Sequence, residues 1–250
     1  MYCKMAMKYL YVPRGRASEY AELACSIYLR CTHKCIYCYC PTILHITREE
    51  FHQQPEERAN FLNYLEEDAK KLSKDEDLRN KLILLSFIGD CYLPIEAETK
   101  LTRSAIEILH KHNLSATILT KAGRLAQRDF DILIPGRDAF AATLTLLDNE
   151  DSLMWEPYAA LPAERMENLK KAHELGLETW VSCEPVIYPE ATLELIKLTA
   201  PFVDHYKVGI LNYHPHGKTI DWHKFAHDVK QTLESLGKPY YLKKDLARHL

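Results

Sequence analysis

Six short apolar runs, separated by charged segments of helical periodicity, constrain the fold of this 250-residue chain more than any other feature. The runs are rich in β-forming residues, and their continuous apolar character suits strands that are buried on both faces of a parallel sheet. Their alternation with helical segments predicts an α/β fold built from repeated βα units. The predicted strands are Leu23–Leu29, Leu82–Ile88, Ala116–Leu119, Phe140–Leu146, Thr179–Cys183 and Tyr206–Ile210.

The segments between these strands carry apolar residues at three- and four-residue intervals, which is typical of amphipathic helices. Pro55 comes just before the first segment, and Gly176 and Gly237 follow two of the others, as is common at helix ends. The predicted helices are Glu56–Leu72, Leu101–His112, Glu164–Leu175, Ala191–Leu198 and Asp221–Leu236. No linker divides the chain, so we expect one core domain over residues 21–250. Residues 1–20 are predicted to form a basic, irregular arm over the first strand.

The composition argues against several classes of protein. Hydrophobic residues make up 47% of the chain and charged residues 27%, which is ordinary for a globular domain. No stretch approaches the ~20 apolar residues of a membrane span, and no signal-peptide core is present, so we expect no membrane partner and a cytoplasmic location. The net charge of −3 gives no overall attraction to nucleic acid. Glycine-rich motifs for dinucleotides or P-loop nucleotides are absent.

Cys31, Cys35 and Cys38 have the spacing C-x₃-C-x₂-C directly after the first predicted strand. Three thiolates on one short loop can bind three corners of a [4Fe–4S] cluster and leave the fourth iron open to a small molecule. Ligand sites in parallel α/β folds form beyond the carboxyl ends of the strands, where this loop is expected. The alternative is a structural zinc site with Cys40 or His33 as the fourth ligand, although structural zinc usually binds two well-separated ligand pairs.

The cysteine spacing, with Tyr37 just before the third cysteine, resembles the motif of the radical S-adenosylmethionine (SAM) superfamily. Other parts of the chain are similar to the spore photoproduct lyase-like branch of that superfamily. These parts are Gly15–Tyr20, Cys38–Pro41, Asp90–Glu96 with Leu101–Arg103, Thr120–Lys121 with Arg128–Asp129, Glu156–Pro157 with Arg165, and Glu184–Pro185.

The resemblance implies a partial (β/α)₆ TIM-like barrel and an enzyme with two cofactors, SAM and a [4Fe–4S] cluster. It implies that Cys31, Cys35 and Cys38 hold the cluster, which cleaves SAM reductively to a 5′-deoxyadenosyl radical. This radical takes a hydrogen atom from a substrate that the sequence does not identify. An external electron donor of the flavodoxin or ferredoxin type is also implied. Tyr37 is expected to contact the adenine, and the competing interpretation is a core tyrosine.

Polar residues after three other strands are candidates for binding SAM. The methionyl end of SAM needs an oxygen acceptor near its ammonium group and a cation or hydroxyl near its carboxylate. Asp90 and Lys121, with their neighbours Gly89 and Thr120, follow the second and third strands and are expected there. Glu184, after the fifth strand, is expected to accept hydrogen bonds from the ribose. The alternative for each charged residue is a solvated loop position.

Cys91 is the candidate catalytic residue. A thiol beside the radical site can return a hydrogen atom to a product radical or bind a second cluster, and the alternative is a small buried apolar residue. In the lyase the hydrogen-donating cysteine lies just before the aspartate, where this chain has Ser86–Gly89, so Cys91 is at best a displaced substitute. Two other functions stay open: lyase repair of a cross-linked pyrimidine photoproduct in DNA, and a zinc-stabilised binding module without turnover.

Overall fold

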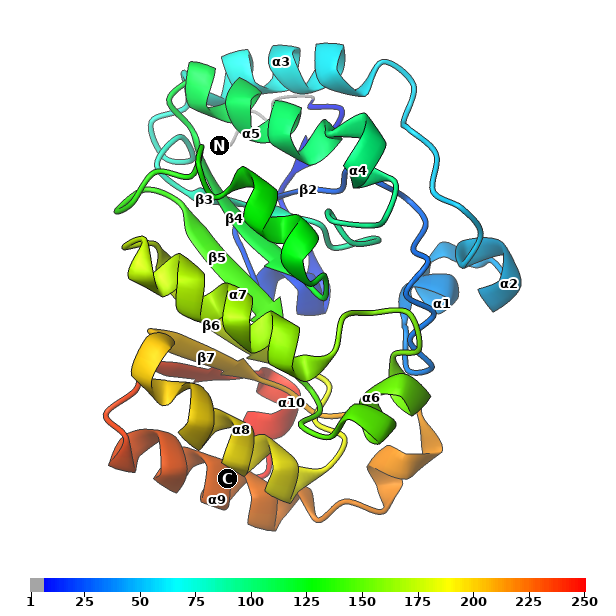
Figure 1. The fold of residues 1–250 in the computed structure, drawn as a ribbon, viewed down its shortest axis with the longest axis vertical. Helices are drawn as coiled ribbons and strands as arrows, with labels where there is room; N and C mark the ends of the chain where they lie inside the picture. The colour runs from blue at the N-terminus through cyan, green and yellow to red at the C-terminus, as the bar shows by residue number, and fades with distance from the viewer. Residues whose placement is uncertain (1–6) are drawn as a thin grey trace.

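The computed structural model describes residues 7–250, which are built around an eight-stranded sheet with the strand order β1-β2-β3-β4-β5-β6-β7-β8. β2 to β8 are parallel to their neighbours, whereas β1 pairs antiparallel with β2. Figure 1 shows the twisted sheet and the helices packed along it. The strands are β1 (Leu10–Tyr11), β2 (Leu23–Cys25), β3 (Leu82–Leu85), β4 (Ser115–Thr120), β5 (Ala139–Thr143), β6 (Glu178–Cys183), β7 (His205–Val208) and β8 (Tyr240–Leu242).

Five longer helices cover one face of the sheet, and the short helices α1, α2 and α6 gather at the edge toward which the parallel strands point (Figure 1). The longer helices are α3 (Phe61–Leu72), α5 (Leu101–Lys111), α7 (Pro162–Glu174), α8 (Pro189–Thr199) and α9 (Trp222–Ser235). The short ones are α1 (Cys40–Leu44), α2 (Arg48–Phe51), α4 (Glu96–Thr99), α6 (Asn149–Trp155) and α10 (Lys244–Ala247). Four 3₁₀ segments complete the fold: η1 (Gly15–Glu19), η2 (Arg124–Asp129), η3 (Ala200–Phe202) and η4 (Pro215–Lys218).

Alternate residues of each strand face the two sides of the sheet, as a pleated strand requires. Ile83 and Leu85 of β3 pack into the large core beneath the helices. Leu84, which lies between them, faces the opposite, inner side of the sheet. There it belongs to a smaller cluster with Ala24, Ala139, Ala141 and Trp180. Because several of these inward residues are alanines, the inner side has room for a cavity.

All six predicted strands are confirmed, but the first, second, fourth and sixth end earlier than predicted. β2 ends at Cys25 rather than Leu29, and β3 ends at Leu85. Ser86 still donates its N–H to the carbonyl of Cys25, but its φ of +85° turns the chain out of the sheet. The apolar residues beyond these points are buried in loops, and burial in a loop gives the same sequence pattern as burial in a strand.

Two predictions at the amino-terminal side are wrong. The irregular arm predicted for residues 1–20 contains β1, which lies edge to edge with β2, and η1, while residues 1–6 lie outside the described part. The first long helix begins at Phe61 rather than Glu56, because Asn60 before it has a φ of +54°. The short strands β1 and β8 and the short helices α1, α2, α4, α6 and α10 are not among the predicted elements. Within residues 7–250, no helix combines the length and apolar character needed to cross a membrane.

The connection between β1 and β2 crosses to the opposite edge of the sheet and contacts β8 and α10. Arg16 Nε lies 2.7 Å from Asp245 Oδ2. The carboxylate of Glu19 accepts hydrogen bonds from the Tyr241 hydroxyl at 3.1 Å and from the Lys244 N–H at 2.7 Å. These contacts join the two edges of the sheet across the open side of the partial barrel.

Asp68 of α3 anchors β1, and its removal is expected to destabilise the protein. One buried carboxylate oxygen of Asp68 accepts hydrogen bonds from the backbone N–H groups of Lys8, Tyr9 and Leu10 at 2.7, 2.6 and 3.1 Å. Asp68→Ala leaves these donors without an acceptor and should lower the free energy of unfolding by about 1–3 kcal/mol in urea denaturation. The exposed neighbour Glu67 provides the control Glu67→Ala. Equal stabilities of the two variants would contradict the anchoring role.

Candidate functional site

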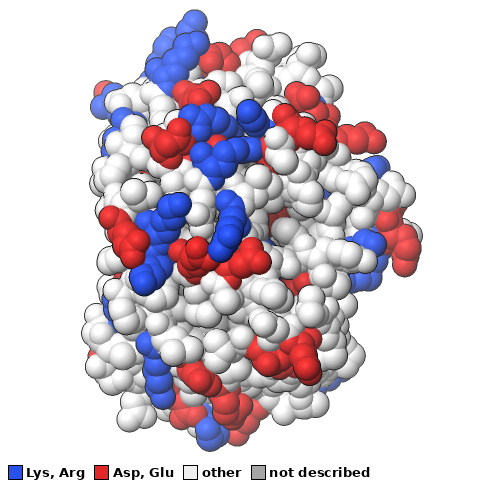
Figure 2. All heavy atoms as spheres, in the orientation of Figure 1, with Lys and Arg blue, Asp and Glu red and all other residues white. Residues whose placement is uncertain are grey.

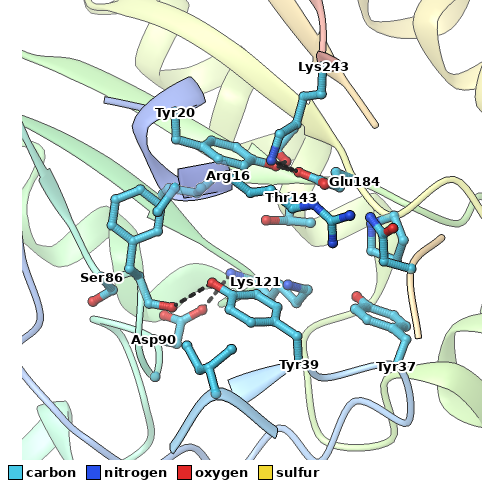
Figure 3. A pocket seen from close by; sticks show the side chains of 18 of the residues that line it. Arg16, Tyr20, Tyr37, Tyr39, Ser86, Asp90, Lys121, Thr143, Glu184 and Lys243 are labelled. Carbon is cyan, nitrogen blue, oxygen red and sulfur yellow. Dashed lines mark hydrogen bonds and ion pairs between the residues drawn. The ribbon is translucent and has the colours of Figure 1, made fainter. Parts of the chain in front are cut away.

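A cavity of about 530 Å³ opens at the carboxyl ends of the parallel strands. Figure 3 shows side chains from several strands and from the cysteine loop pointing into it. All six residues that the sequence suggested for SAM binding line this one cavity, namely Tyr37, Gly89, Asp90, Thr120, Lys121 and Glu184. The structure therefore brings together side chains that follow β2, β3, β4 and β6.

The loop that carries Cys31, Cys35 and Cys38 lies between β2 and α1, at the same edge of the sheet as the cavity. Its backbone is fixed by neighbouring elements. Arg48 of α2 donates to the carbonyl oxygens of Cys35 at 2.6 Å and of Cys38 at 3.2 Å, and the N–H of Ile36 donates to a carbonyl at the end of α6 at 2.9 Å. The cysteines themselves do not line the cavity, whereas Tyr37 of the same loop does.

The chemistry of the loop fits a thiolate-bound iron–sulfur cluster. Burial raises the pKa of Cys35 to about 12, and the ammonium of Lys121 opposes that rise. A hydrogen bond from Cys40 is the main reason that the pKa of Cys38 falls to about 7, with smaller contributions from Lys121 and Arg48. Soft sulfur donors beside two cations suit an anionic cluster, whose iron ions replace the thiol protons.

Among residues 7–250, no three His, Cys, Asp or Glu side chains converge as they would around a single metal ion.

Asp90 connects three segments at the base of the cavity. Its carboxylate accepts hydrogen bonds from the N–H of Tyr92 at 2.8 Å, the hydroxyl of Thr120 at 2.6 Å and the N–H of Lys121 at 2.7 Å. His33 Nε2, from the cysteine loop, lies 3.2 Å from Asp90 Oδ2. Burial alone would raise the pKa of Asp90, but His33 and the other donors hold it well below its usual range. Three hydrogen bonds and the nearby imidazole thus engage both carboxylate oxygens within the protein.

Glu156 supports Tyr37 from below the cavity. The Tyr37 hydroxyl donates to the carboxylate of Glu156, which also accepts from the Thr145 hydroxyl at 3.1 Å and lies 2.5 Å from the Arg165 guanidinium. Arg165 is 1% exposed and donates its other N–H groups to the carbonyls of Ala160 and Thr143. This buried network fixes the position of the Tyr37 ring relative to β5 and α7.

A second polar cluster surrounds Glu184. One carboxylate oxygen of Glu184 accepts from the Tyr20 hydroxyl at 2.5 Å and from the Lys243 ammonium at 2.7 Å. The Tyr20 hydroxyl also lies 2.7 Å from the Ser182 hydroxyl. Burial and the neighbouring carboxylate of Glu184 raise the pKa of Tyr20 well above its ordinary value, so Tyr20 stays neutral. Figure 3 shows Tyr20, Lys243 and Glu184 on the wall of the cavity opposite Tyr39.

Cys91 lies apart from this site. Its side chain is fully buried in the core beneath the helices, and its Sγ lies 3.9 Å from the carbonyl oxygen of Leu119. It does not line the cavity. Its position is that of a packed core residue.

The family assignment follows from comparison with known proteins. The model of the radical SAM superfamily matches residues 25–236 of the chain, which include the cysteine loop and most of the cavity. The chain belongs to the radical SAM superfamily. It is therefore an enzyme whose cofactors are SAM and a [4Fe–4S] cluster, and this membership sets aside the hypothesis of a non-catalytic zinc module.

Two curated relatives are themselves uncharacterized proteins. The chain is 27% identical over 203 residues to the protein MJ0683 of Methanocaldococcus jannaschii. The aligned region covers 77% of this chain and 71% of the relative. It is also 27% identical over 175 residues to the protein ORF301 of Acidianus two-tailed virus, and here it spans 56% of the relative's length.

Solved structures share the fold of this radical SAM enzyme. Spore photoproduct lyase complexed with dinucleoside spore photoproduct has a TM-score of 0.73 at 15% identity, covering 96% of this chain and 80% of that one. Streptococcus suis SuiB bound to S-adenosylmethionine has a TM-score of 0.61 at 13% identity, covering 88% of this chain and 49% of that one. These likenesses confirm the predicted partial barrel.

The sequence did not assign site roles to Arg16, Tyr20, Ser182 or Lys243, which also line the cavity. Segments containing three of these residues were noticed, but no local pattern shows that residue 20 and residue 243 meet at Glu184. The one available signal is Lys243, which follows directly after the apolar residues of β8. A lysine that is buried at such a position needs an anionic partner.

Gly89 is expected to tolerate no side chain. Its φ is +77°, and a Cβ there would lie 2.8 Å from the carbonyl oxygen of Arg30 and 3.0 Å from that of Tyr28. Gly136 has a similar φ of +74° but open space around it. Gly136→Ala should therefore cost about 1 kcal/mol of stability from backbone strain alone, and Gly89→Ala about 3 kcal/mol or more. Urea denaturation measures both, and equal losses would show that the close approach to the carbonyls is unimportant.

The ion pair of Glu156 with Arg165 is expected to give a pH-dependent part of the stability. Burial alone would raise the pKa of Glu156, but Arg165 and Lys121 lower it below its ordinary value of 4.5. Glu156→Gln leaves Arg165 buried without a counter-charge and should cost about 3–5 kcal/mol at pH 7. A carboxylate with a lowered pKa stabilises the fold above pH 4.5, and this contribution is lost as the pH falls through the folded-state pKa.

The difference in unfolding free energy between the wild type and Glu156→Gln should therefore shrink below about pH 4.5. Glu167 lies on α7, the helix that carries Arg165, and its carboxylate forms an exposed pair with Arg124 at 3.6 Å, so Glu167→Gln is the control. This control should change stability little at any pH. A pH-independent difference for Glu156→Gln would contradict a role of its charge.

Proposed function

We propose that Cys31, Cys35 and Cys38 bind the [4Fe–4S] cluster and that SAM occupies the adjacent cavity, where a hydrogen atom is removed from a bound substrate. The observation that carries this proposal is the convergence of the six residues suggested for SAM binding on one cavity beside the cysteine loop. When bound and reduced, the cluster and SAM together supply a 5′-deoxyadenosyl radical. The chain's own residues hold these groups in place and exclude water.

Each polar residue has a definite part in this proposal. Lys121 is a half-buried lysine whose ammonium lies near Tyr37, placed to balance the charge of the thiolates and of the SAM carboxylate. Asp90 acts as a positioning residue, because its oxygens already hold Thr120 and the backbone of Lys121. Tyr37, fixed by Glu156, offers a ring for the adenine.

The partners of the reaction follow from the same chemistry. An external donor of the flavodoxin or ferredoxin type delivers the electron. None of the seven cysteines within the described part of the chain forms a disulfide, which supports a reducing compartment such as the cytoplasm. Repair of a DNA photoproduct stays a prediction, since the likeness to spore photoproduct lyase lies in the fold and Cys91 is buried away from the cavity.

Loss of any one cluster cysteine is expected to abolish SAM cleavage. The protein is reconstituted anaerobically with iron and sulfide, and the visible absorbance and iron content are measured. It is then incubated with reductant and SAM, and 5′-deoxyadenosine is quantified. Cys31→Ala, Cys35→Ala and Cys38→Ala should each lower 5′-deoxyadenosine formation by at least about a thousandfold, because the cluster loses a corner ligand.

Cys183→Ala is the matched control for this experiment. Cys183 is a buried thiol of β6 that packs in the core, so its removal should leave cluster loading and SAM cleavage in place. A wild-type protein that binds iron and sulfide but forms no 5′-deoxyadenosine would refute the proposed function. So would full cluster loading in the three loop variants.

A further inference from the structure

Two arginines on the β1–β2 connection face the cavity from the wall formed by the joined edges of the sheet. Arg14 and Arg16 both line the cavity, and Figure 3 shows Arg16 beside Tyr20. The Arg16 Nε pairs with Asp245, and its Nη1 donates to the Tyr213 hydroxyl at 3.0 Å. These contacts orient the guanidinium and leave its Nη2 without a partner in residues 7–250. Arg14 has no ion-pair or side-chain hydrogen-bond partner within the same described range.

The charges around the cavity are unbalanced. Four cationic side chains line it, while the only carboxylates among the described lining residues are Asp90 and Glu184. Both carboxylates are already engaged, Asp90 by hydrogen-bond donors of the chain and Glu184 by Tyr20 and Lys243. SAM carries a net positive charge and cannot correct the imbalance. Lys121 lies beside the thiolates and Arg16 Nε is paired with Asp245, so Arg14 and the Nη2 group of Arg16 are left to meet another anion.

Resting on the function proposed above, we propose that the substrate is a small anionic molecule whose carboxylate or phosphate group binds to Arg14 and Arg16. A guanidinium presents paired N–H donors that match either of these groups. A cationic substrate would find no free carboxylate in the described wall of the cavity. The two arginines thus select the substrate by charge.

The side chains at the rim of the cavity indicate the chemistry of the rest of the substrate. Three large apolar side chains line the cavity and are unusually exposed, Tyr39 at 41%, Ile43 at 50% and Tyr213 at 71%. Tyr213 lies against Arg16, with the guanidinium carbon 5.5 Å from its ring centroid. A ligand that covers exposed apolar side chains of this kind removes apolar surface from water, which favours binding. A ring or other apolar body next to the anionic group therefore fits the site.

The bridge across the open side of the partial barrel favours a small-molecule substrate over a polymer. The β1–β2 connection is tied to α10 and β8 by Arg16 and Glu19, so the gap between the sheet edges is bridged. The cavity volume of about 530 Å³ lies in the range of small-molecule sites and must also hold SAM. On the face shown in Figure 2, basic and acidic side chains are interspersed, with no continuous basic stripe for a nucleic acid backbone.

The test uses phenyl phosphate, benzoate and benzylamine, three probes that share one ring and differ in charge. Each is titrated anaerobically into the SAM-bound holoenzyme by calorimetry. Phenyl phosphate or benzoate should bind and benzylamine should not, and the better anion identifies the substrate group. Arg14→Ala and Arg16→Ala should each weaken anion binding by about tenfold, as expected for loss of a charged hydrogen bond. Arg79→Ala, at an exposed arginine far from the cavity, should leave it unchanged.

The outcomes separate this inference from the proposed function. 5′-Deoxyadenosine formation is measured on the same wild-type holoenzyme, and its failure counts against the proposed function alone. Equal binding of all three probes, or anion binding that survives Arg14→Ala, overturns the inference. Arg14 has no internal partner among residues 7–250, so its removal does not disturb the fold. Displacement of phenyl phosphate by a short oligothymidylate at much lower concentration would assign the anion to a nucleic acid and also overturn the proposal.

Discussion

The carboxylate of Asp90 is the point on which the site depends. It receives hydrogen bonds from the segment after β3 and from the end of β4, and it lies against His33 of the cysteine loop. Buried carboxylates persist in proteins when donors surround them, and a fully satisfied group of this kind fixes the geometry of everything it touches. The ends of two strands and the loop that carries the thiols are therefore held in one arrangement before any cofactor arrives.

A second buried charge supports the other side of the loop. Glu156 connects Tyr37 to Arg165, and Arg165 in turn binds the carbonyl of Thr143 at the end of β5. Asp90 thus supports the loop at His33, and Glu156 supports it at Tyr37. Such prior positioning matters for radical chemistry, because a reactive intermediate that drifts from its target meets other groups first.

The sequence predicted those features that depend on local pattern. The strands appear as apolar runs and the cysteine loop as close cysteine spacing, so the sequence predicts both, together with the residues that directly follow each strand. The site roles of Lys243 and Arg16 were not found, because their partners lie far away in the chain. Glu156 was noticed as part of a resemblance, yet its burial was unexpected, since a charged residue in a sequence is usually exposed. The position of Cys91 depends on side-chain packing, which spacing alone does not reveal.

The bridge between the two edges of the sheet also affects how the molecule assembles. The hydrogen bond from Lys244 to Glu19 spans 225 positions, so one wall of the cavity cannot form during synthesis until the β8 region has left the ribosome. The cysteine loop, by contrast, is made early. The nascent chain thus contains the cysteine loop while the cavity still lacks one wall. The late docking of α10 completes that wall.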